Sequence, residues 1–250
     1  MCGRYALISA PEAIRALFGY QDQPNFPPRY NITPTQPVAI VRVAEGARRF
    51  ALVRWGLIPP WVKDPRTLSV LFNARGESVN DKPAFRLAMR RRRCLFPADG
   101  FYEWRQLGRD RRPFFVRSRT GGPIAFAGLW ETWMGPNGEE METAAIVTTA
   151  ANRTLAAIHP RMPVVIAPEA FDLWLGGNDL DVAAATALIA PAPEDALEAY
   201  EVSAAVNSAT NDAPDLIAPA PPAGRDPAPD EKGRARNPNA KDDAQPSLFD

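Results

Sequence analysis

Six short runs of β-branched and aromatic residues, separated by turn residues, constrain the fold of this chain more than any other feature. They span residues 38–43, 49–57, 113–117, 124–130, 143–149 and 163–166. Turn signals such as Glu45-Gly46 and Pro136-Asn137-Gly138 lie between neighbouring runs. Short strands joined through such turns are typical of antiparallel sheets. The sequence therefore predicts a largely antiparallel β structure.

Helical patterns are fewer and shorter. Ser9 and Glu12 have the spacing of a capping box, and the helix that they would open carries Ile14, Leu17 and Phe18 on one face. Further helices are expected at residues 82–90, 168–175 and 181–190. Many strands with a few helices predict the α+β class. A chain of 250 residues, 46% of them hydrophobic, can bury the core of one domain.

The composition changes near Pro219. Residues 219–240 are rich in Pro, Ala, Asp, Arg and Asn and nearly devoid of large apolar side chains. Such a segment cannot bury enough apolar surface to offset the entropy cost of ordering it, so we expect it to be disordered. Leu248 and Phe249 make the extreme end apolar again. The sequence therefore predicts a folded domain at residues 1–218 and a tail at residues 219–250 that ends in a short binding motif.

Charge and cysteine content limit the function classes. The formal net charge is zero, so bulk electrostatics favours neither nucleic acid nor a membrane as partner. No segment approaches the ~20 apolar residues of a membrane span, and the N-terminus lacks a signal-peptide pattern. The two cysteines, Cys2 and Cys94, indicate a reducing, cytoplasmic compartment. Because His159 is the single histidine, we expect no metal site, and no cofactor is predicted.

Cys2 is the most reactive candidate. Aminopeptidases remove an initiator Met readily before a small side chain, so loss of Met1 would leave Cys2 with a free α-amine beside its thiol. The amine has a pKa of roughly 7.7–8.0 and the thiol about 8.5, so each has a reactive fraction near neutral pH. A 1,2-aminothiol condenses with an aldehyde to a thiazolidine, and it can also attack acyl carbons. The alternative is that Cys2 is an early residue of an edge strand.

Three further groups could take part in chemistry. Glu103 is flanked by aromatic residues, which would raise its pKa toward the range of general acid–base catalysis; it could instead be a solvent-facing strand residue. His159 lies in a proline-bounded loop and could be catalytic or simply packed. Asn73 and Arg75 follow the apolar run at residues 70–72, where they could form a site or a turn.

Several residues suit an unpaired nucleic acid, because arginines contact phosphates and aromatic rings stack on bases. They are Arg4, Arg75, Arg161, the run Arg90–Arg93, and the exposed-looking Trp55 and Trp61. Each signal is weak alone, and the arginine run is more typical of a solvated helix end.

Motifs in a fixed order extend over about residues 2–217. They are Met1-Cys2-Gly3-Arg4-Tyr5, Arg29-Tyr30-Asn31-Ile32-Thr33-Pro34, Trp55-Gly56-Leu57-Ile58-Pro59, Asn73-Ala74-Arg75-Gly76-Glu77, residues 93–104, residues 146–150, His159-Pro160-Arg161-Met162-Pro163, Val206-Asn207-Ser208 and Asn211-Asp212. Together they resemble the SOS-response-associated peptidase family, the abasic-site processing proteins that crosslink to DNA. The resemblance implies one domain with a strongly bent, partly barrel-like antiparallel sheet, a few peripheral helices and a groove for single-stranded DNA.

The resemblance also implies a reaction centred on Cys2 after removal of Met1. The amine would form a Schiff base with the aldehyde of an abasic site, and the thiol would close the thiazolidine, which shields the lesion in the DNA damage (SOS) response. Asn73 would position Cys2, Glu103 would transfer protons, and His159 would assist opening of the sugar ring. DNA contacts are implied for Arg4, Arg75 and Arg161 (phosphates), Thr148 (close to the lesion), and Pro34 and Trp61 (wedge and stacking surface). The expected protein is a monomer in the bacterial cytoplasm, associated with the nucleoid.

The tail carries a separate signal. Gln245, Leu248 and Phe249 are spaced as in the Q-x-x-L-F peptide by which bacterial DNA-metabolic proteins bind the sliding clamp, although Pro246 replaces the commoner Leu. The resemblance therefore implies the clamp as a partner.

Three other functions stay open. Class II glutamine amidotransferases also begin Met-Cys-Gly, but no glutamine-pocket motif is found here. A thiol peptidase could use Cys2, His159 and Glu103, and some relatives resemble self-processing peptidases, so hydrolase and protease labels are also expected. A binding module with a structural Cys2 is the last alternative.

Overall fold

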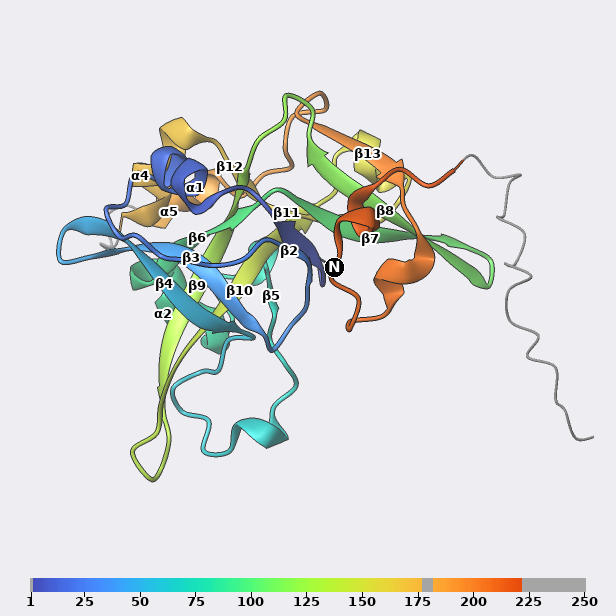
Figure 1. Ribbon diagram of the computed structural model, residues 1–250. Helices are drawn as coiled ribbons and strands as arrows, with labels where there is room; N and C mark the ends of the chain where they lie inside the picture. The colour runs from blue at the N-terminus through green and yellow to red at the C-terminus, as the bar shows by residue number, and fades with distance from the viewer. Residues whose placement is uncertain (1, 177–181, 222–250) are drawn as a thin grey trace, which may run out of the picture. The chain divides into compact units, whose positions relative to one another are not determined.

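Strands make up most of the regular structure in the computed structural model, which describes residues 2–176 and 182–221 (Figure 1). The strands are β1 (Tyr5–Leu7), β2 (Arg29–Ile32), β3 (Pro37–Ala44), β4 (Ala47–Trp55), β5 (Asn73–Arg75), β6 (Arg93–Ala98), β7 (Gly100–Leu107), β8 (Asp110–Ser118), β9 (Ile124–Met134), β10 (Glu140–Ala150), β11 (Arg161–Pro163), β12 (Val165–Ile166) and β13 (Leu197–Glu201). The α-helices are α1 (Pro11–Phe18), α2 (Pro83–Arg91), α3 (Arg153–Ala156), α4 (Phe171–Leu175) and α5 (Val182–Ala187). Short 3₁₀ turns are η1 (Pro65–Thr67), η2 (Gly76–Ser78), η3 (Pro168–Ala170), η5 (Ala204–Asn207) and η6 (Pro214–Ile217). The predicted α+β class is confirmed.

Five strands close into a barrel in the order β10-β4-β3-β6-β9, with β9 pairing back onto β10. Four of these ladders are antiparallel, while β10 and β4 run parallel. A ring with an odd number of strands cannot alternate direction all the way round, so one neighbouring pair must be parallel. The prediction of largely antiparallel strands is therefore correct, and the β10–β4 pair is the exception that closure requires. The short strand β5 also runs parallel to β10, directly beyond β4.

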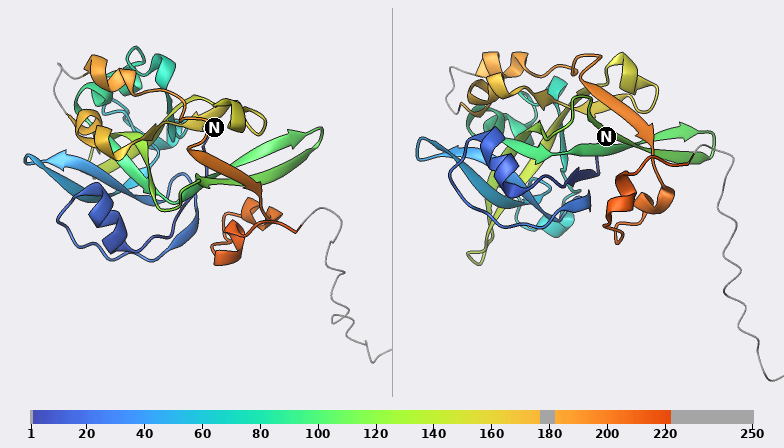
Figure 2. Two further views of the ribbon diagram at one scale, coloured as in Figure 1. Left: turned by 90° about the horizontal axis from the view of Figure 1, so that it is seen from above. Right: turned by 45° about the horizontal axis from the view of Figure 1, so that its top comes forward.

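A second sheet is open and antiparallel, with the order β13-β8-β7-β1-β2. The chain passes from the barrel to this sheet at Asp99, between β6 and β7. In Figures 1 and 2 the β7–β8 hairpin projects from the barrel on the side opposite α1, α4 and α5. Strand β1 is paired on both sides, so Cys2 does not begin an edge strand.

The start of α1 differs from the predicted capping box. The helix begins at Pro11 after Ala10, and no side chain caps it. Ser9 instead directs its hydroxyl to Asp99, whose carboxylate also accepts the backbone N–H groups of Ile8 (2.6 Å) and Ser9 (2.8 Å). The tertiary contact with Asp99 therefore outcompetes the local cap.

One expectation about surface residues is wrong, and a second is correct only for Arg90 and Arg91, which are exposed at the end of α2. Trp55 is fully buried; it packs edge-on against Tyr5 at 5.3 Å between ring centroids and donates its indole N–H to the carbonyl of Phe72 at 2.8 Å. Within the run Arg90–Arg93, Arg93 is only 2% exposed and donates to the carbonyl oxygens of Met89 and Trp174. The run is thus partly structural, since carbonyl dipoles compensate the buried guanidinium.

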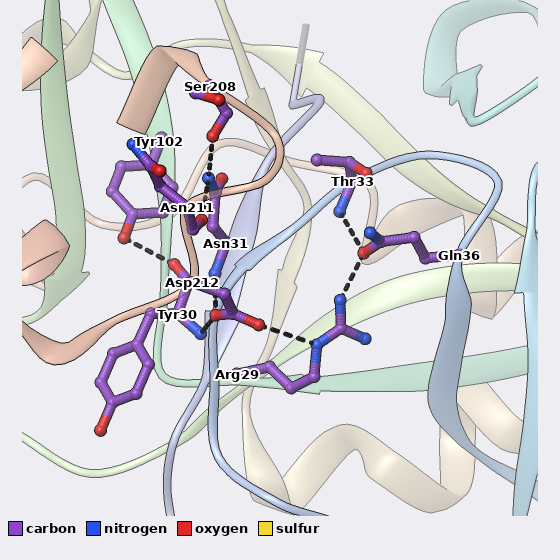
Figure 3. A network of polar contacts seen from close by, with 9 residues as sticks. All are labelled: Arg29, Tyr30, Asn31, Thr33, Gln36, Tyr102, Ser208, Asn211 and Asp212. Carbon is purple, nitrogen blue, oxygen red and sulfur yellow. Dashed lines mark hydrogen bonds and ion pairs between the residues drawn. The ribbon is translucent and has the colours of Figure 1, made fainter. Parts of the chain in front are cut away.

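A polar network fastens the C-terminal segment of the domain to β2 (Figure 3). Asn31, 1% exposed, donates to the carbonyls of Ser208 (3.0 Å) and Asn211 (2.8 Å). The Asp212 carboxylate accepts the backbone N–H groups of Tyr30 and Asn31, and it pairs with Arg29 at 3.3 Å. Because every partner is a main-chain group or an opposite charge, the segment is held in one register against the N-terminal strands.

The residues up to Ala220 form one compact unit. The clamp motif with Gln245, Leu248 and Phe249 lies outside the described residues, as do most of the expected tail and the first residue of the predicted helix 181–190. Within the described ranges, no helix combines the length and apolar character needed to span a bilayer.

Candidate functional site

Strands from both sheets bring the sequence-predicted site residues together. Cys2 precedes β1, Glu103 lies in β7, and Asn73 begins β5. The Asn73 amide donates to the carbonyl oxygen of Cys2 at 2.9 Å, which links the open sheet to the barrel. His159 Nδ1 lies 3.7 Å from Glu103 Oε1. The Glu103 carboxylate also acts electrostatically on the Cys2 thiol, so the four residues predicted to be catalytic lie close together.

Cys2 is fully buried, and its Sγ lies 3.9 Å from the carbonyl oxygen of Arg4. Burial raises the pKa of the Cys2 thiol well above its ordinary range, and the nearby Glu103 carboxylate adds to the rise. The resting side chain is therefore a neutral thiol. A reaction of this thiol at neutral pH needs a neighbouring base.

Asn73 presents two ends with different roles. Its Nδ2 is engaged by the Cys2 carbonyl, whereas its Oδ1 is buried and accepts no hydrogen bond within the described parts of the chain. A buried acceptor without a donor is costly. The amide is therefore prepared to accept a hydrogen bond from a group that arrives beside Cys2.

Glu103 is 4% exposed. Residues two apart in a strand share a face, so Glu103 lies on the same side of β7 as the core residue Phe101. Burial raises the pKa of the Glu103 carboxyl from 4.5 to about 7. Glu103 is therefore not a solvent-facing strand residue, and it can both donate and accept a proton near neutral pH.

His159 is partly exposed and held by its own loop. His159 Nδ1 lies 3.1 Å from both the backbone N–H and the carbonyl oxygen of Arg161, so it accepts from the first when the ring proton is on Nε2 and donates to the second when the proton is on Nδ1. Burial lowers the pKa of His159 below its ordinary 6.5. The neutral imidazole thus turns its Nδ1 side toward Arg161 and Glu103 and leaves Nε2 as its second polar atom.

A cationic group adjoins these residues. Arg161, at the start of β11, donates to the carbonyl (2.8 Å) and hydroxyl (3.2 Å) of the buried Thr148. It also forms a two-pronged ion pair with Glu77. Arg75 is exposed and lies opposite Thr148 in the β5–β10 ladder. The predicted DNA contacts Arg75, Arg161 and Thr148 are therefore neighbours.

The remaining predicted DNA contacts, Arg4, Pro34 and Trp61, belong to other segments of the chain. Arg4 donates to Asn31 Oδ1 (3.0 Å) and to the carbonyl oxygens of Val206 and Asn207, so much of its guanidinium serves the C-terminal segment. Pro34 is half-buried in the turn between β2 and β3. Trp61 is 54% exposed in the loop at residues 56–72.

Three residues of the two networks were not predicted from sequence: Glu77, Asn31 and Asp212, although each belongs to a quoted motif. For Asn31 and Glu77 the available signal was a polar residue inside or close after a short strand, whereas Asp212 lies in the loop between η5 and η6. The partners of all three residues are distant in sequence. No group of three or more His, Cys, Asp or Glu side chains among the described residues is arranged to hold a metal ion.

The chain is similar in sequence to proteins of a known family. The family described as SOS response associated peptidase (SRAP) matches residues 1–209. The "Abasic site processing protein YoqW" of Bacillus subtilis is 37% identical over 221 residues, covering 87% of this chain and 99% of the relative. The mouse "Abasic site processing protein HMCES" is 29% identical, covering 88% of this chain and 76% of the relative.

Solved structures agree with the fold. A Bacteroides thetaiotaomicron protein superposes with a TM-score of 0.76 at 23% identity, covering 88% of this chain and all of the other. A phage-related protein of Bordetella bronchiseptica gives a TM-score of 0.64 at 32% identity, covering 80% of this chain and 94% of the other. On the family match and the identity to YoqW, the chain belongs to the SOS response associated peptidase family.

Proposed function

We propose that this protein recognises abasic sites in single-stranded DNA and forms a covalent thiazolidine crosslink through Cys2 after removal of Met1. The relatives named as abasic site processing proteins support the choice of lesion. The observation that carries the proposal is the arrangement around Cys2. Its carbonyl is held by Asn73 at 2.9 Å, and a carboxyl with a pKa of about 7, that of Glu103, lies close by.

The reaction begins at the amine, since the buried thiol is neutral at rest. An abasic sugar equilibrates between a closed ring and an open-chain aldehyde at C1′. In the tautomer that carries its proton on Nε2, His159 is suited to assist opening by donating to the ring oxygen. The Cys2 amine adds to C1′ and gives a carbinolamine. Protonated Glu103 gives its proton to the carbinolamine hydroxyl, which leaves as water, and an iminium forms.

Ring closure uses the same two groups. The Glu103 carboxylate takes the thiol proton, Sγ adds to C1′, and the thiazolidine forms with Glu103 again protonated. One aldehyde and one aminothiol thus give one thiazolidine and one water. Because Cys2 holds both nucleophiles on one residue, the second addition is intramolecular and gains a high effective concentration. The buried Asn73 Oδ1 would accept a hydrogen bond from the amine and orient it.

The test is incubation of purified protein with a single-stranded oligonucleotide that carries one abasic site, followed by denaturing electrophoresis and intact-mass measurement. Wild type is expected to give a heat-stable adduct whose mass is that of the Met1-free protein plus the oligonucleotide minus one water. Cys2→Ala is expected to give none, whereas Cys94→Ala, which changes the other buried cysteine, keeps the adduct.

The same assay separates the competing functions. An amidohydrolase would give no adduct and would release ammonia from glutamine, and a thiol peptidase would cleave peptides without DNA. An adduct that survives Cys2→Ala would refute the role of Cys2. We further propose that Gln245, Leu248 and Phe249 bind the sliding clamp and bring this activity to replicating DNA.

A further inference from the structure

The guanidinium of Arg161 already holds an anion of the chain itself. Both terminal nitrogens are used by Glu77, with Nη2 donating to Oε2 at 3.0 Å and Nη1 donating to Oε1. A planar fork that binds two oxygens of one carboxylate is the geometry by which arginine also binds a phosphate. Glu77 thus makes the pair of contacts that a DNA phosphate would make at this position.

Arg161 does not depend on Glu77 for its orientation. Its Nη2 also donates to the carbonyl oxygen (2.8 Å) and the hydroxyl (3.2 Å) of Thr148, a fully buried residue in the β10–β11 ladder. The Arg161 side chain is 19% exposed, whereas that of Glu77 is 55% exposed. The Arg161 guanidinium is therefore held by Thr148 on its buried side, and the Glu77 carboxylate is the member of the pair that can move into solvent.

Arg75 adds a second positive charge beside this pair. It lies two residues before Glu77 and opposite Thr148 in the β5–β10 ladder, it is exposed, and no ion pair involving it is found among the described residues. With Glu77 in place, two arginines are offset by one carboxylate. Removal of Glu77 would leave two adjacent arginines, which is a stronger phosphate site.

We propose that Glu77 occupies the phosphate subsite of Arg161 in the free protein and is displaced when the DNA backbone binds. This inference rests on the proposed function, since it takes single-stranded DNA as the ligand. Glu77 then acts as an internal competitor that weakens binding to any polyanion. It determines specificity because a strand without further contacts at Cys2 has less binding energy with which to displace it.

The experiment measures the Kd of a fluorescent, undamaged single-stranded oligonucleotide by anisotropy at fixed salt. Glu77→Gln keeps the size of the side chain but removes its charge. We expect binding about 2- to 5-fold tighter than wild type, the range that corresponds to one exposed ion pair. The matched control is Glu198→Gln, which removes a carboxylate that pairs with Arg117 at 2.8 Å in the open sheet and changes the net charge equally.

A second background isolates the contact. In Arg161→Gln protein, Glu77→Gln is expected to change Kd no more than Glu198→Gln does, because the shared guanidinium is gone. Unchanged or weaker binding by Glu77→Gln, with Glu198→Gln as reference, would overturn the inference and would leave Glu77 as a structural support of Arg161. The unfolding midpoint of each variant is measured alongside, because a structural support would lower it while a competitor would not.

The outcomes for the two proposals are separable. If wild type forms the adduct but Glu77→Gln binds no tighter, Glu77 is not a competitor and the crosslinking function stands. If wild type forms no adduct but Glu77→Gln tightens DNA binding, the competitor role stands and the crosslinking function fails. If neither protein binds single-stranded DNA, both proposals fail.

Discussion

Replacing Glu103 by Gln tests the central electrostatic feature of the site through folding stability. Burial raises the pKa of Glu103 from 4.5 to about 7, so between these values the folded protein binds a proton that the unfolded chain has lost. Stability from this group is therefore fully present below about pH 4.5 and is lost as pH rises toward 7. At roughly 1.4 kcal/mol per pKa unit, the ionised carboxylate costs about 3 kcal/mol above pH 7. Because Glu103 is only 4% exposed, solvent screening reduces this figure little.

The assay is urea unfolding of wild type and Glu103→Gln at pH 5 and pH 8. Gln resembles the protonated carboxyl in size and cannot ionise, so the two proteins should differ little at pH 5. At pH 8 the variant should be more stable by up to about 3 kcal/mol. His159 titrates in the opposite sense, because burial lowers its pKa, and it lies 3.7 Å from Glu103, so the comparison is repeated in a His159→Gln background to remove its contribution. A stability difference that is the same at both pH values would refute the claim that burial raises the pKa of Glu103.

Two further predictions concern DNA and the tail. Trp61→Ala should weaken binding of single-stranded DNA by about 10-fold, since stacking on one base contributes about 1–3 kcal/mol. The unfolding midpoint should stay near wild type, because Trp61 is 54% exposed. Anisotropy measures the affinity and thermal unfolding the midpoint, and an unchanged affinity would show that Trp61 does not stack on the DNA. Deletion of residues 244–250 should abolish binding to a purified sliding clamp in surface plasmon resonance and leave adduct formation intact. Equal clamp affinity with and without these residues would refute the proposal that the tail binds the clamp.

The strand pattern was the most predictable part of the fold. Each of the six apolar runs overlaps strand structure, for example residues 38–43 in β3 (Pro37–Ala44) and residues 143–149 in β10 (Glu140–Ala150). The Glu45-Gly46 turn has positive φ at both residues (54° and 76°), as a two-residue hairpin requires. These features are local, so the sequence contains them directly.

The missed elements are those in which tertiary contacts override local pattern. Strand β6 (Arg93–Ala98) is buried along its whole length but begins with a charged residue, and the carbonyls of Met89 and Trp174 make Arg93 acceptable there. Trp55 resembled a surface aromatic because the rings that cover it, Tyr5 and Phe72, come from distant segments. The Ser9 hydroxyl likewise has its partner about ninety residues away, at Asp99.

The candidate site depends on the position of the parallel strand pair in the barrel, which the residue pattern of the sequence does not predict. Closure of five strands requires a parallel pair, and the sequence does not indicate which pair it is. In this fold the parallel pair is β10 with β4, at residues 143–144 of β10. At residues 146–148 β10 switches to a second parallel partner, β5. The switch places Asn73 and Arg75 along the edge of β10, opposite Ile146 and Thr148.

The same switch inserts the loop at residues 56–72 between β4 and β5, and this loop carries Trp61. Gly56 donates to the carbonyl of Ala144, and Ile146 donates to that of Phe72, so both ends of the loop are fixed on nearby residues of β10. An exposed aromatic side chain and the cationic group of Arg75 and Arg161 are thereby tied to one strand. The place where strand alternation must fail is thus the place where the residues proposed to contact phosphates and bases are brought together with Asn73, the partner of Cys2, from distant segments.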